Sequence, residues 1–198
     1  MTEHYYTKNP TSEHHERDVK AAIFGFEFTF TTDSGVFSRD GVDPGTRTLI
    51  EALPGLEGRA LDLGCGWGAA GLPVAKKNPG CTVVMTDINE RAAELSRRNA
   101  KRNGVSNVEI VTGDGLESVS GPFNTVFTNP PIRAGKQKIY SMFAECRDLL
   151  VPGGCLYIVI RKQQGAPSAL KYLTELYGEA EVIDRSAGYW IIRARKQA

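Results

Sequence analysis

Residues 128–136, TNPPIRAGK, combine groups that could hold an amine in a fixed position. The side-chain oxygen of Asn129 can accept one hydrogen bond, and the backbone carbonyl of Pro130, restrained by the ring of Pro131, can accept another. Two fixed acceptors would orient an aromatic amine, whose nitrogen lone pair is delocalised into its ring. A plain Asn-Pro turn is the alternative, so the interpretation depends on what lies beside this segment.

A second segment, residues 62–68 with the sequence DLGCGWG, has the composition of a ligand-binding turn. Its glycines, Gly64, Gly66 and Gly68, allow a sharp turn and a close approach of the backbone to a ligand. The same glycines followed by Ala69 also match the dinucleotide fingerprint G-x-G-x-x-G/A. Asp87 follows about 20 residues later. A carboxylate at this place binds the ribose hydroxyls of the ligand, whether the ligand is a dinucleotide or S-adenosylmethionine.

Two carboxylates favour S-adenosylmethionine over a nicotinamide dinucleotide. Asp62 directly precedes the glycines, where it suits the amine and sulfonium of the methyl donor and would repel a pyrophosphate. Asp114, between Gly113 and Gly115, could accept a hydrogen bond from the exocyclic amine of adenine. An oxidoreductase would also require a hydride-transfer partner such as a Tyr-x-x-x-Lys helix, which the sequence lacks. Methylation of an aligned amine needs no strong base, because the nitrogen becomes acidic only after the transfer.

A regular alternation of strands and helices must position these segments. The expected strands are 59–63, 81–86, 108–111, 123–128 and 155–160, and the expected helices are 69–77, 90–103, 138–150 and 167–177. Two more strands are expected at 180–184 and 189–194, and the connection between them is too short for a parallel crossover. The pattern predicts an α/β fold: a Rossmann-like, doubly wound, seven-stranded sheet, mostly parallel with an antiparallel terminal strand.

The segment before this alternation is expected to form a cap on the core. We expect a single domain, 1–198, in which 1–57 is the cap and 58–198 is the Rossmann-like catalytic core. Residues 24–32 alternate aromatic and polar side chains as a strand does, and residues 36–38 are expected to return as a second short strand in a β-hairpin. Residues 44–53 are expected to be helical, with Asp43 as the N-cap and Pro44 in the first position.

Several of these motifs together resemble those of class I S-adenosylmethionine-dependent methyltransferases: DLGCGWG, Asp87, Gly113-Asp114 and NPPI. Residues 35–46, GVFSRDGVDPGT, are similar to the segment before the first motif in the methyltransferase small domain family, which includes ribosomal RNA guanine-N2 methyltransferases. The resemblance implies S-adenosyl-L-methionine as the cofactor and methyl transfer to the N2 amine of a guanine in ribosomal RNA. It implies catalytic roles for Asn129, Pro130 and Pro131. It also implies a cofactor site formed by Phe37, Ser38, Thr46, Asp62, Gly64, Cys65, Gly66, Gly68, Asp87, Ile88, Asp114 and Asn129.

The chain departs from the family pattern in two respects. Methylators of adenine and of glutamine usually carry Tyr or Phe after NPP, whereas this chain has Ile132, which cannot stack on a target ring. The small-subunit guanine methyltransferases often carry a second, methyltransferase-like lobe, whereas this chain is expected to form only a single lobe. Methylation of another amine, whether adenine N6, a protein glutamine or a small molecule, therefore stays open, as does a non-catalytic cofactor-binding or RNA-binding module.

The charge pattern is compatible with RNA only through a local patch. The net charge is +1, so no overall basic field attracts nucleic acid. Arg133, Lys136 and Lys138 follow the Asn-Pro-Pro segment, and Arg161 and Lys162 follow the strand at 155–160. Both loops leave the same edge of the sheet, so these cations, with Ile132, are expected to bind the substrate. The target base would be flipped into the site or taken from a single-stranded loop.

Composition excludes several other classes of protein. No apolar run approaches the roughly 20 residues that cross a bilayer, and the polar N-terminus has no signal-peptide core, so we expect a cytoplasmic protein without a membrane partner. The four cysteines lie far apart and are expected to be buried free thiols. His14 and His15 are adjacent rather than spaced as metal ligands on a helix, so no metal site is expected.

Overall fold

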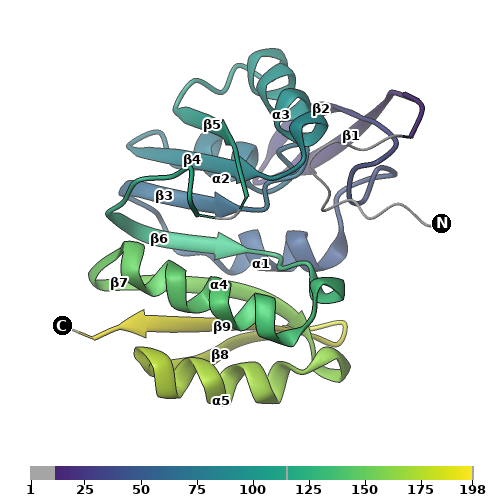
Figure 1. The fold of residues 1–198 in the computed structure, drawn as a ribbon. Helices are drawn as coiled ribbons and strands as arrows, with labels where there is room; N and C mark the ends of the chain where they lie inside the picture. The colour runs from purple at the N-terminus through teal and green to yellow at the C-terminus, as the bar shows by residue number, and fades with distance from the viewer. Residues whose placement is uncertain (1–11, 115, 198) are drawn as a thin grey trace.

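The computed structural model describes residues 12–114 and 116–197, which form a seven-stranded sheet and a separate two-stranded hairpin (Figure 1). The order of the large sheet is β5-β4-β3-β6-β7-β9-β8. Its strands are β3 (Gly58–Leu63), β4 (Cys81–Asp87), β5 (Val108–Thr112), β6 (Phe123–Thr128), β7 (Leu150–Arg161), β8 (Gly178–Ser186) and β9 (Tyr189–Lys196). The α-helices are α1 (Pro44–Ala52), α2 (Gly71–Lys77), α3 (Glu90–Arg102), α4 (Lys136–Leu149) and α5 (Ala166–Tyr177).

The sheet confirms the expected fold class. Strands β3 to β7 pair in parallel, and β9 is antiparallel to both β7 and β8. The differences from the expected elements lie at their ends. Helix α2 begins two residues late, because residues 69 and 70 still belong to the turn after β3. Strand β7 begins at Leu150 rather than at 155, and its pairing with β6 shifts register between Phe123 and Thr125.

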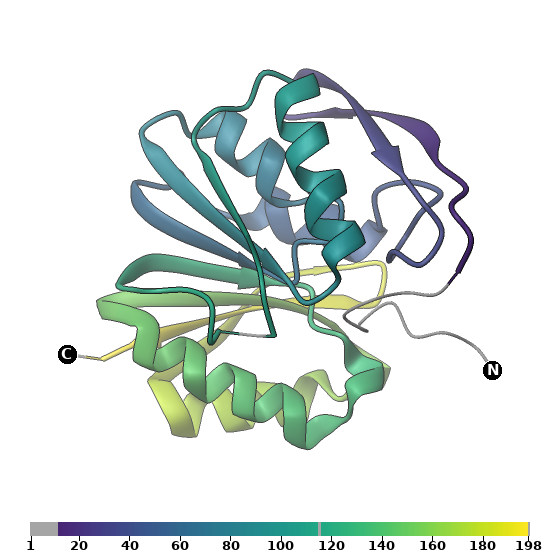
Figure 2. The same ribbon diagram turned by 45° about the horizontal axis from the view of Figure 1, so that its top comes forward.

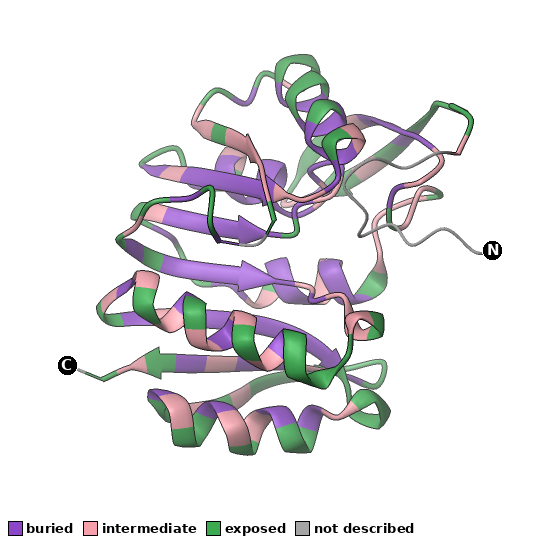
Figure 3. Cartoon of the chain, in the orientation of Figure 1, coloured by how far each residue is buried: buried purple, intermediate pink, exposed green. Residues whose placement is uncertain are grey.

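The helices cover both faces of the sheet (Figure 2), and an apolar cluster is buried on each face. Leu49 of α1, Leu72 of α2 and Leu95 of α3 belong to one buried cluster. Phe143 of α4 and Leu173 of α5 belong to the other. The central strands are buried on both faces while the outer helix surfaces are exposed (Figure 3), which explains why these strands read as continuous apolar runs.

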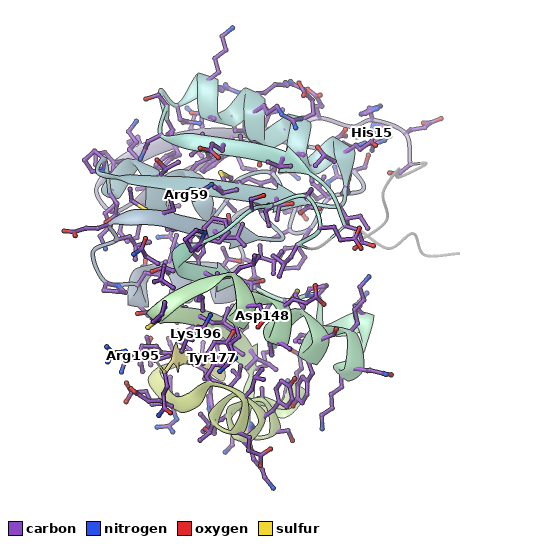
Figure 4. All side chains as sticks on the ribbon, turned by 60° about the vertical axis from the view of Figure 1, so that its left-hand side comes forward. His15, Arg59, Asp148, Tyr177, Arg195 and Lys196 are labelled. Atoms are coloured by element: carbon purple, nitrogen blue, oxygen red, sulfur yellow. The ribbon has the colours of Figure 1, made fainter. Side chains whose placement is uncertain are left out.

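Two hydrogen bonds from side chains to backbone carbonyls also stabilise the packing around the second cluster. The Tyr177 hydroxyl donates to the Phe143 carbonyl at 2.8 Å, joining α5 to α4, and burial raises the pKa of this phenol. The Lys196 ammonium donates to the Leu150 carbonyl at 2.7 Å, fixing the end of β9 against the start of β7. Both side chains are labelled in Figure 4. The Lys196 contact lies at the start of β7, at the edge of the sheet opposite the cavity described below.

The cap differs from its expected arrangement. The hairpin consists of β1 (Arg17–Ile23) and β2 (Phe26–Thr32), turning at Phe24 and Gly25, which both have positive φ. The expectation that residues 36–38 form the second strand is wrong: these residues lie in an irregular loop. Ser38 has φ +53° and the indole of Trp67 donates to the Phe37 carbonyl at 2.9 Å, so the loop is fastened to the core instead of to β2.

Side chains of α3 fix the hairpin to the core. The Asn99 side chain exchanges two hydrogen bonds with the backbone of Thr31, at 2.8 and 2.9 Å, and continues the edge of the hairpin as a strand would. Arg98 forms a bidentate pair with Glu16, and Arg102 forms one with Asp18. The hairpin is therefore held on α3, and the cap reaches the candidate site through the loop that follows the hairpin and through α1.

Candidate active site

A cavity of about 470 Å³ lies at the carboxyl ends of the parallel strands, where open α/β sheets bind ligands. Seventeen sequence-predicted site residues line it: Phe37, Ser38, Thr46, Asp62, Gly64, Cys65, Gly66, Asp87, Ile88, Asp114, Asn129, Pro130, Pro131, Ile132, Arg133, Lys138 and Arg161. Gly68, Lys136 and Lys162 are not part of the lining. The cavity is also lined by residues that sequence reasoning assigned no site role: Asp43, Leu49, Trp67, Asn89, Met142, Gln164 and Tyr189.

The glycine turn, residues 64–68, is held by the backbone of the neighbouring strand. The amides of Gly64 and Cys65 both donate to the Thr86 carbonyl, at 2.9 and 3.0 Å. Gly64 and Gly66 have positive φ, and a Cβ at either position would meet nothing within 4 Å. A Cβ at Gly68 would instead lie 2.7 Å from Leu72 Cδ1. The first two glycines therefore leave the cavity open, while the third permits α2 to pack against the turn.

Asp62 supplies a buried carboxylate beneath this turn. The residue is 2% exposed, and its Oδ2 atom has no hydrogen-bond partner among the described residues. Burial raises the pKa of Asp62 to about 7; the nearby charge of Asp87 adds to this effect and the Gly71 amide opposes it. An unpartnered buried carboxylate oxygen beside a cavity suits a cationic group of a ligand. The amine of S-adenosylmethionine is such a group, so the Asp62 carboxylate fits this cofactor.

Asp87, at the end of β4, presents a carboxylate whose orientation is fixed. Its Oδ2 accepts from the Gly66 amide at 2.8 Å and its Oδ1 from the Asn89 amide at 2.9 Å. Burial raises the pKa of Asp87 despite these two hydrogen bonds. Carboxylate oxygens retain further lone pairs, so this side chain can also accept from ribose hydroxyls. Ile88, half-buried beside it, offers an apolar surface to an adenine.

Asn129 is oriented by two residues of the cap. Its Nδ2 atom donates to Asp43 Oδ2 at 3.2 Å and to Thr46 Oγ1 at 2.9 Å. Asp43 is also the N-cap of α1, as expected, and accepts from the Thr46 amide at 3.0 Å. The link between Asp43 and Asn129 spans 86 positions, so no local sequence signal could have revealed it.

The two prolines shape the turn that follows β6. Pro130 is buried and Pro131 is half-buried, and both line the cavity. The Pro131 carbonyl accepts from the Ala134 amide at 2.8 Å and begins the short helix η1 (Ile132–Ala134). The chain therefore changes direction directly after β6, and Asn129 and Pro130 lie at the cavity wall.

Three cations, Arg133, Lys138 and Arg161, form a basic rim on the cavity. The guanidinium of Arg161 lies 4.7 Å from the centre of the Tyr189 ring and donates to the Tyr189 hydroxyl at 2.7 Å. Lys138 lies 3.9 Å from Asp114, and both side chains are mostly exposed. Arg161 is therefore the most firmly positioned of the three cations.

The two remaining predicted cations, Lys136 and Lys162, lie outside this lining. Lys136 lies over the Tyr140 ring of its own helix, 5.1 Å from the centroid. Lys162 is exposed at the start of the helix η2 (Lys162–Gln164). A contact with the extended backbone of a large substrate stays a prediction for both.

Other expected features can be placed in the described part of the chain. Cys65, Cys81 and Cys146 are buried and Cys155 is half-buried, all four as free thiols. Burial raises the pKa of Cys65 well above its usual range, which disfavours the thiolate. In residues 12–114 and 116–197, no group of His, Cys, Asp and Glu side chains is arranged to hold a metal ion. Among those residues, no helix is both long and apolar enough to span a membrane.

Comparison with known proteins shows similarity to one family. The family model described as methyltransferase small domain matches residues 27–193. The uncharacterized protein YbxB of Bacillus subtilis (strain 168) is 44% identical over 200 residues, which cover 99% of this chain and 100% of that protein. The ribosomal RNA small subunit methyltransferase C of Aeromonas hydrophila is 39% identical over 137 residues, which cover 67% of this chain and 40% of the relative.

Among solved structures, the 16S rRNA N2 G1207 methyltransferase (RsmC) of T. thermophilus, in complex with AdoMet and guanosine, has a TM-score of 0.82. It is 26% identical in sequence, and the similarity covers 95% of this chain and 52% of that one. The chain thus spans about half the length, or less, of these named ribosomal RNA methyltransferases, and the full length of YbxB.

Proposed function

The chain belongs to the methyltransferase small domain family, and we propose that it is an S-adenosylmethionine-dependent N-methyltransferase that acts on the N2 amine of a guanine in ribosomal RNA. The observation that carries the proposal is the orientation of Asn129. With its Nδ2 donating to Asp43 and Thr46, its Oδ1 is left to accept from a substrate N–H in the cavity. An amine is the class of nucleophile that two neutral acceptors recognise.

The donor side of the cavity comprises the glycine turn and two carboxylates. Asp62 would bind the amine of the methyl donor, and Asp87 would bind its ribose. The glycine turn would lie against the methionine part, which can approach the backbone closely because Gly64 and Gly66 have no side chains. Phe37, Ser38, Cys65, Ile88 and Asp114 would complete the enclosure. When bound, the donor supplies an electrophilic methyl group on a sulfonium.

The acceptor side comprises Asn129 and the Pro130 carbonyl. Their oxygens would accept the two N–H bonds of the substrate amine, directing its lone pair at the methyl group and favouring a pyramidal nitrogen. The proton leaves only after the N–C bond has formed, when the methylated amine is positively charged and strongly acidic. No buried base is required, and water at the open mouth of the cavity can take the proton.

Three observations support a guanine in ribosomal RNA as the substrate. Relatives with 39% and 26% identity are named as small-subunit ribosomal RNA methyltransferases, and one of them was solved with guanosine. The position after the prolines is Ile132, without the aromatic ring usual in methylators of adenine and glutamine. The basic rim of Arg133, Lys138 and Arg161 suits the phosphates that flank a base entering the cavity.

The test is a transfer assay with a radiolabelled methyl donor. Wild type and Asn129→Ala would be compared on deproteinised ribosomal RNA, on 30S and 50S particles from a methylation-deficient strain, and on a ribosome-free protein fraction. We expect N2-methylguanine in RNA, with transfer by the variant lower by a factor on the order of 10² to 10³. Binding of S-adenosylhomocysteine, measured by calorimetry, should be retained in the variant.

Other outcomes of the assay would redirect the proposal. Label in protein or in N6-methyladenine would contradict guanine as the target while leaving amine methylation intact. Tight binding of the methyl donor without transfer to any fraction would favour a non-catalytic cofactor-binding or RNA-binding module.

A further inference from the structure

We propose that Asp43 and Thr46, at the start of α1, form an amide clamp: a pair of acceptors that sets which end of the Asn129 side chain faces the substrate. This inference rests on the proposed function. It assigns both residues a positioning role, in place of the cofactor contact that the family resemblance implies for Thr46. An asparagine amide has two ends of similar shape and opposite hydrogen-bonding character. A flipped Asn129 would present N–H groups to a substrate amine that needs acceptors.

The clamp follows from the chemistry of its members. A carboxylate oxygen can only accept a hydrogen bond, so Asp43 Oδ2, at 3.2 Å, requires the nitrogen end of the amide to face it. Thr46 Oγ1, at 2.9 Å, accepts from the same nitrogen, so both N–H bonds of Asn129 are used. Turning the amide over would place Asn129 Oδ1 against the carboxylate oxygen, and two acceptors repel each other.

The clamp is rigid because its two members are fixed to one another. Asp43 Oδ2 accepts from the Thr46 amide at 3.0 Å as the N-cap of α1, so the same oxygen binds both the helix and Asn129. Thr46 is 6% exposed. A Cβ at Gly45 would lie 2.7 Å from Tyr189 Cε1 and 3.0 Å from Asp43 Oδ2, so this close packing requires a glycine between the two clamp residues.

The clamp also explains why the cap is needed at the site. Every strand that carries a ligand-facing group belongs to the core, yet the acceptor geometry of Asn129 is imposed by residues of the cap. Displacement of α1 would leave the glycine turn unchanged and release the amide. The expected signature of damage to the clamp is therefore a fall in kcat with an unchanged affinity for the methyl donor.

The decisive variant is Thr46→Val, which removes the acceptor hydroxyl and keeps the side-chain shape and the backbone N–H. We expect kcat to fall about tenfold, with the Kd for S-adenosylhomocysteine and the melting temperature unchanged. Thr46→Ser should restore kcat, because it restores the hydroxyl. The matched control is Thr48→Val on the same helix. The Thr48 hydroxyl donates to the Pro44 carbonyl at 2.9 Å, and Thr48 is not part of the cavity lining.

Asp43→Asn provides a second variant, because asparagine is an equally good N-cap and α1 should remain intact. An asparagine there can donate as well as accept, so it tolerates both orientations of the Asn129 amide. We expect kcat to fall again without loss of donor binding. Equal kcat in wild type, Thr46→Val and Asp43→Asn would overturn the clamp.

A measurement without turnover separates the clamp from the proposed function. In protein labelled with ¹⁵N on asparagine side chains, the Asn129 signal is identified by its loss in Asn129→Ala. Its NH₂ protons should exchange slowly with water, and faster in Thr46→Val but not in Thr48→Val. An Asn129 signal that is indifferent to Thr46→Val would overturn the clamp even in an active enzyme. Slow exchange in a protein that methylates nothing would support the clamp and refute the proposed function alone.

Discussion

The two turns that form the cavity are fixed in different ways. The glycine turn is held by backbone hydrogen bonds from the adjacent strand, with Gly64 and Cys65 both bound to the Thr86 carbonyl. The turn at Asn129 is held through its side chain by Asp43 and Thr46 of the cap. The first turn is therefore held mainly by the core, with one contact to the cap from Trp67 to the Phe37 carbonyl. The second turn depends on the cap for the orientation of its key side chain.

This difference assigns separate tasks to the two regions. A turn built from backbone keeps its shape under most side-chain changes and suits an invariant ligand such as the methyl donor. A turn whose key amide is oriented by another element can be tuned by that element. Damage to the glycine turn should appear in stability and donor affinity, whereas damage to the Asn129 turn should appear in kcat.

The largest expected effect concerns Asp62 and stability. The pKa of this carboxyl is raised to about 7 in the folded protein from 3.8, so the folded state keeps a proton that the unfolded state releases. The contribution of Asp62 to stability is present below pH 4 and is lost as the pH rises to 7. Relative to wild type, Asp62→Asn should gain about 3 kcal/mol in the free energy of unfolding between pH 5 and pH 8. Urea denaturation at both pH values measures this gain, and a constant difference would contradict the buried, neutral carboxyl.

The same substitution should have the opposite effect on ligand binding. If Asp62 binds the donor amine, Asp62→Asn should weaken the affinity for S-adenosylhomocysteine about 100-fold at pH 8, because a charged hydrogen bond is lost. Wild-type affinity should rise as the pH increases through 7, and the variant should lack this component. Calorimetric titrations of both proteins from pH 6 to pH 9 provide the comparison, and parallel pH profiles would rule out a contact with Asp62.

A smaller loss is expected at the third glycine of the turn. Gly68 has φ +94°, and a Cβ there would lie 2.7 Å from Leu72 Cδ1, so Gly68→Ala should destabilise the protein by about 2 kcal/mol. Gly80→Ala is the control, since a Cβ at that position meets nothing within 4 Å. Thermal denaturation of the two variants measures the difference. Equal melting temperatures would show that the turn tolerates a side chain at Gly68.

The smallest expected effect concerns the backbone of the Asn129 turn. Pro131→Ala removes the ring that restrains the Pro130 carbonyl, and kcat should fall about two- to fivefold as the turn gains conformational freedom. Donor affinity should not change. Pro167→Ala, at the exposed start of α5, serves as the control. A drop in donor affinity for Pro131→Ala alone would mean that the two turns are coupled and would weaken the contrast between them.

Much of the core could be predicted because its signals are local. The strand 123–128 and the start of α1 at Asp43-Pro44 occur where the apolar pattern and the capping residues indicate. The cap hairpin was harder to predict, because β1 mixes charged and apolar residues. Its pairing with β2 depends on the turn at Phe24 and Gly25 and on contacts with α3. Residues 36–38 resemble a strand in composition but are fastened by Trp67, a residue far along the chain.

The sequence by itself determined the α/β alternation, the glycine turn and the Asn-Pro-Pro turn. Each of these depends on residues within a few positions of one another, through apolar periodicity and the backbone restrictions of glycine and proline. Only the tertiary structure decided the burial of Asp62, the placement of Arg161 on Tyr189 and the attachment of Asn129 to Asp43 and Thr46. These contacts join residues from separate elements, and they exist only because the cap and the far strands pack onto the same edge of the sheet.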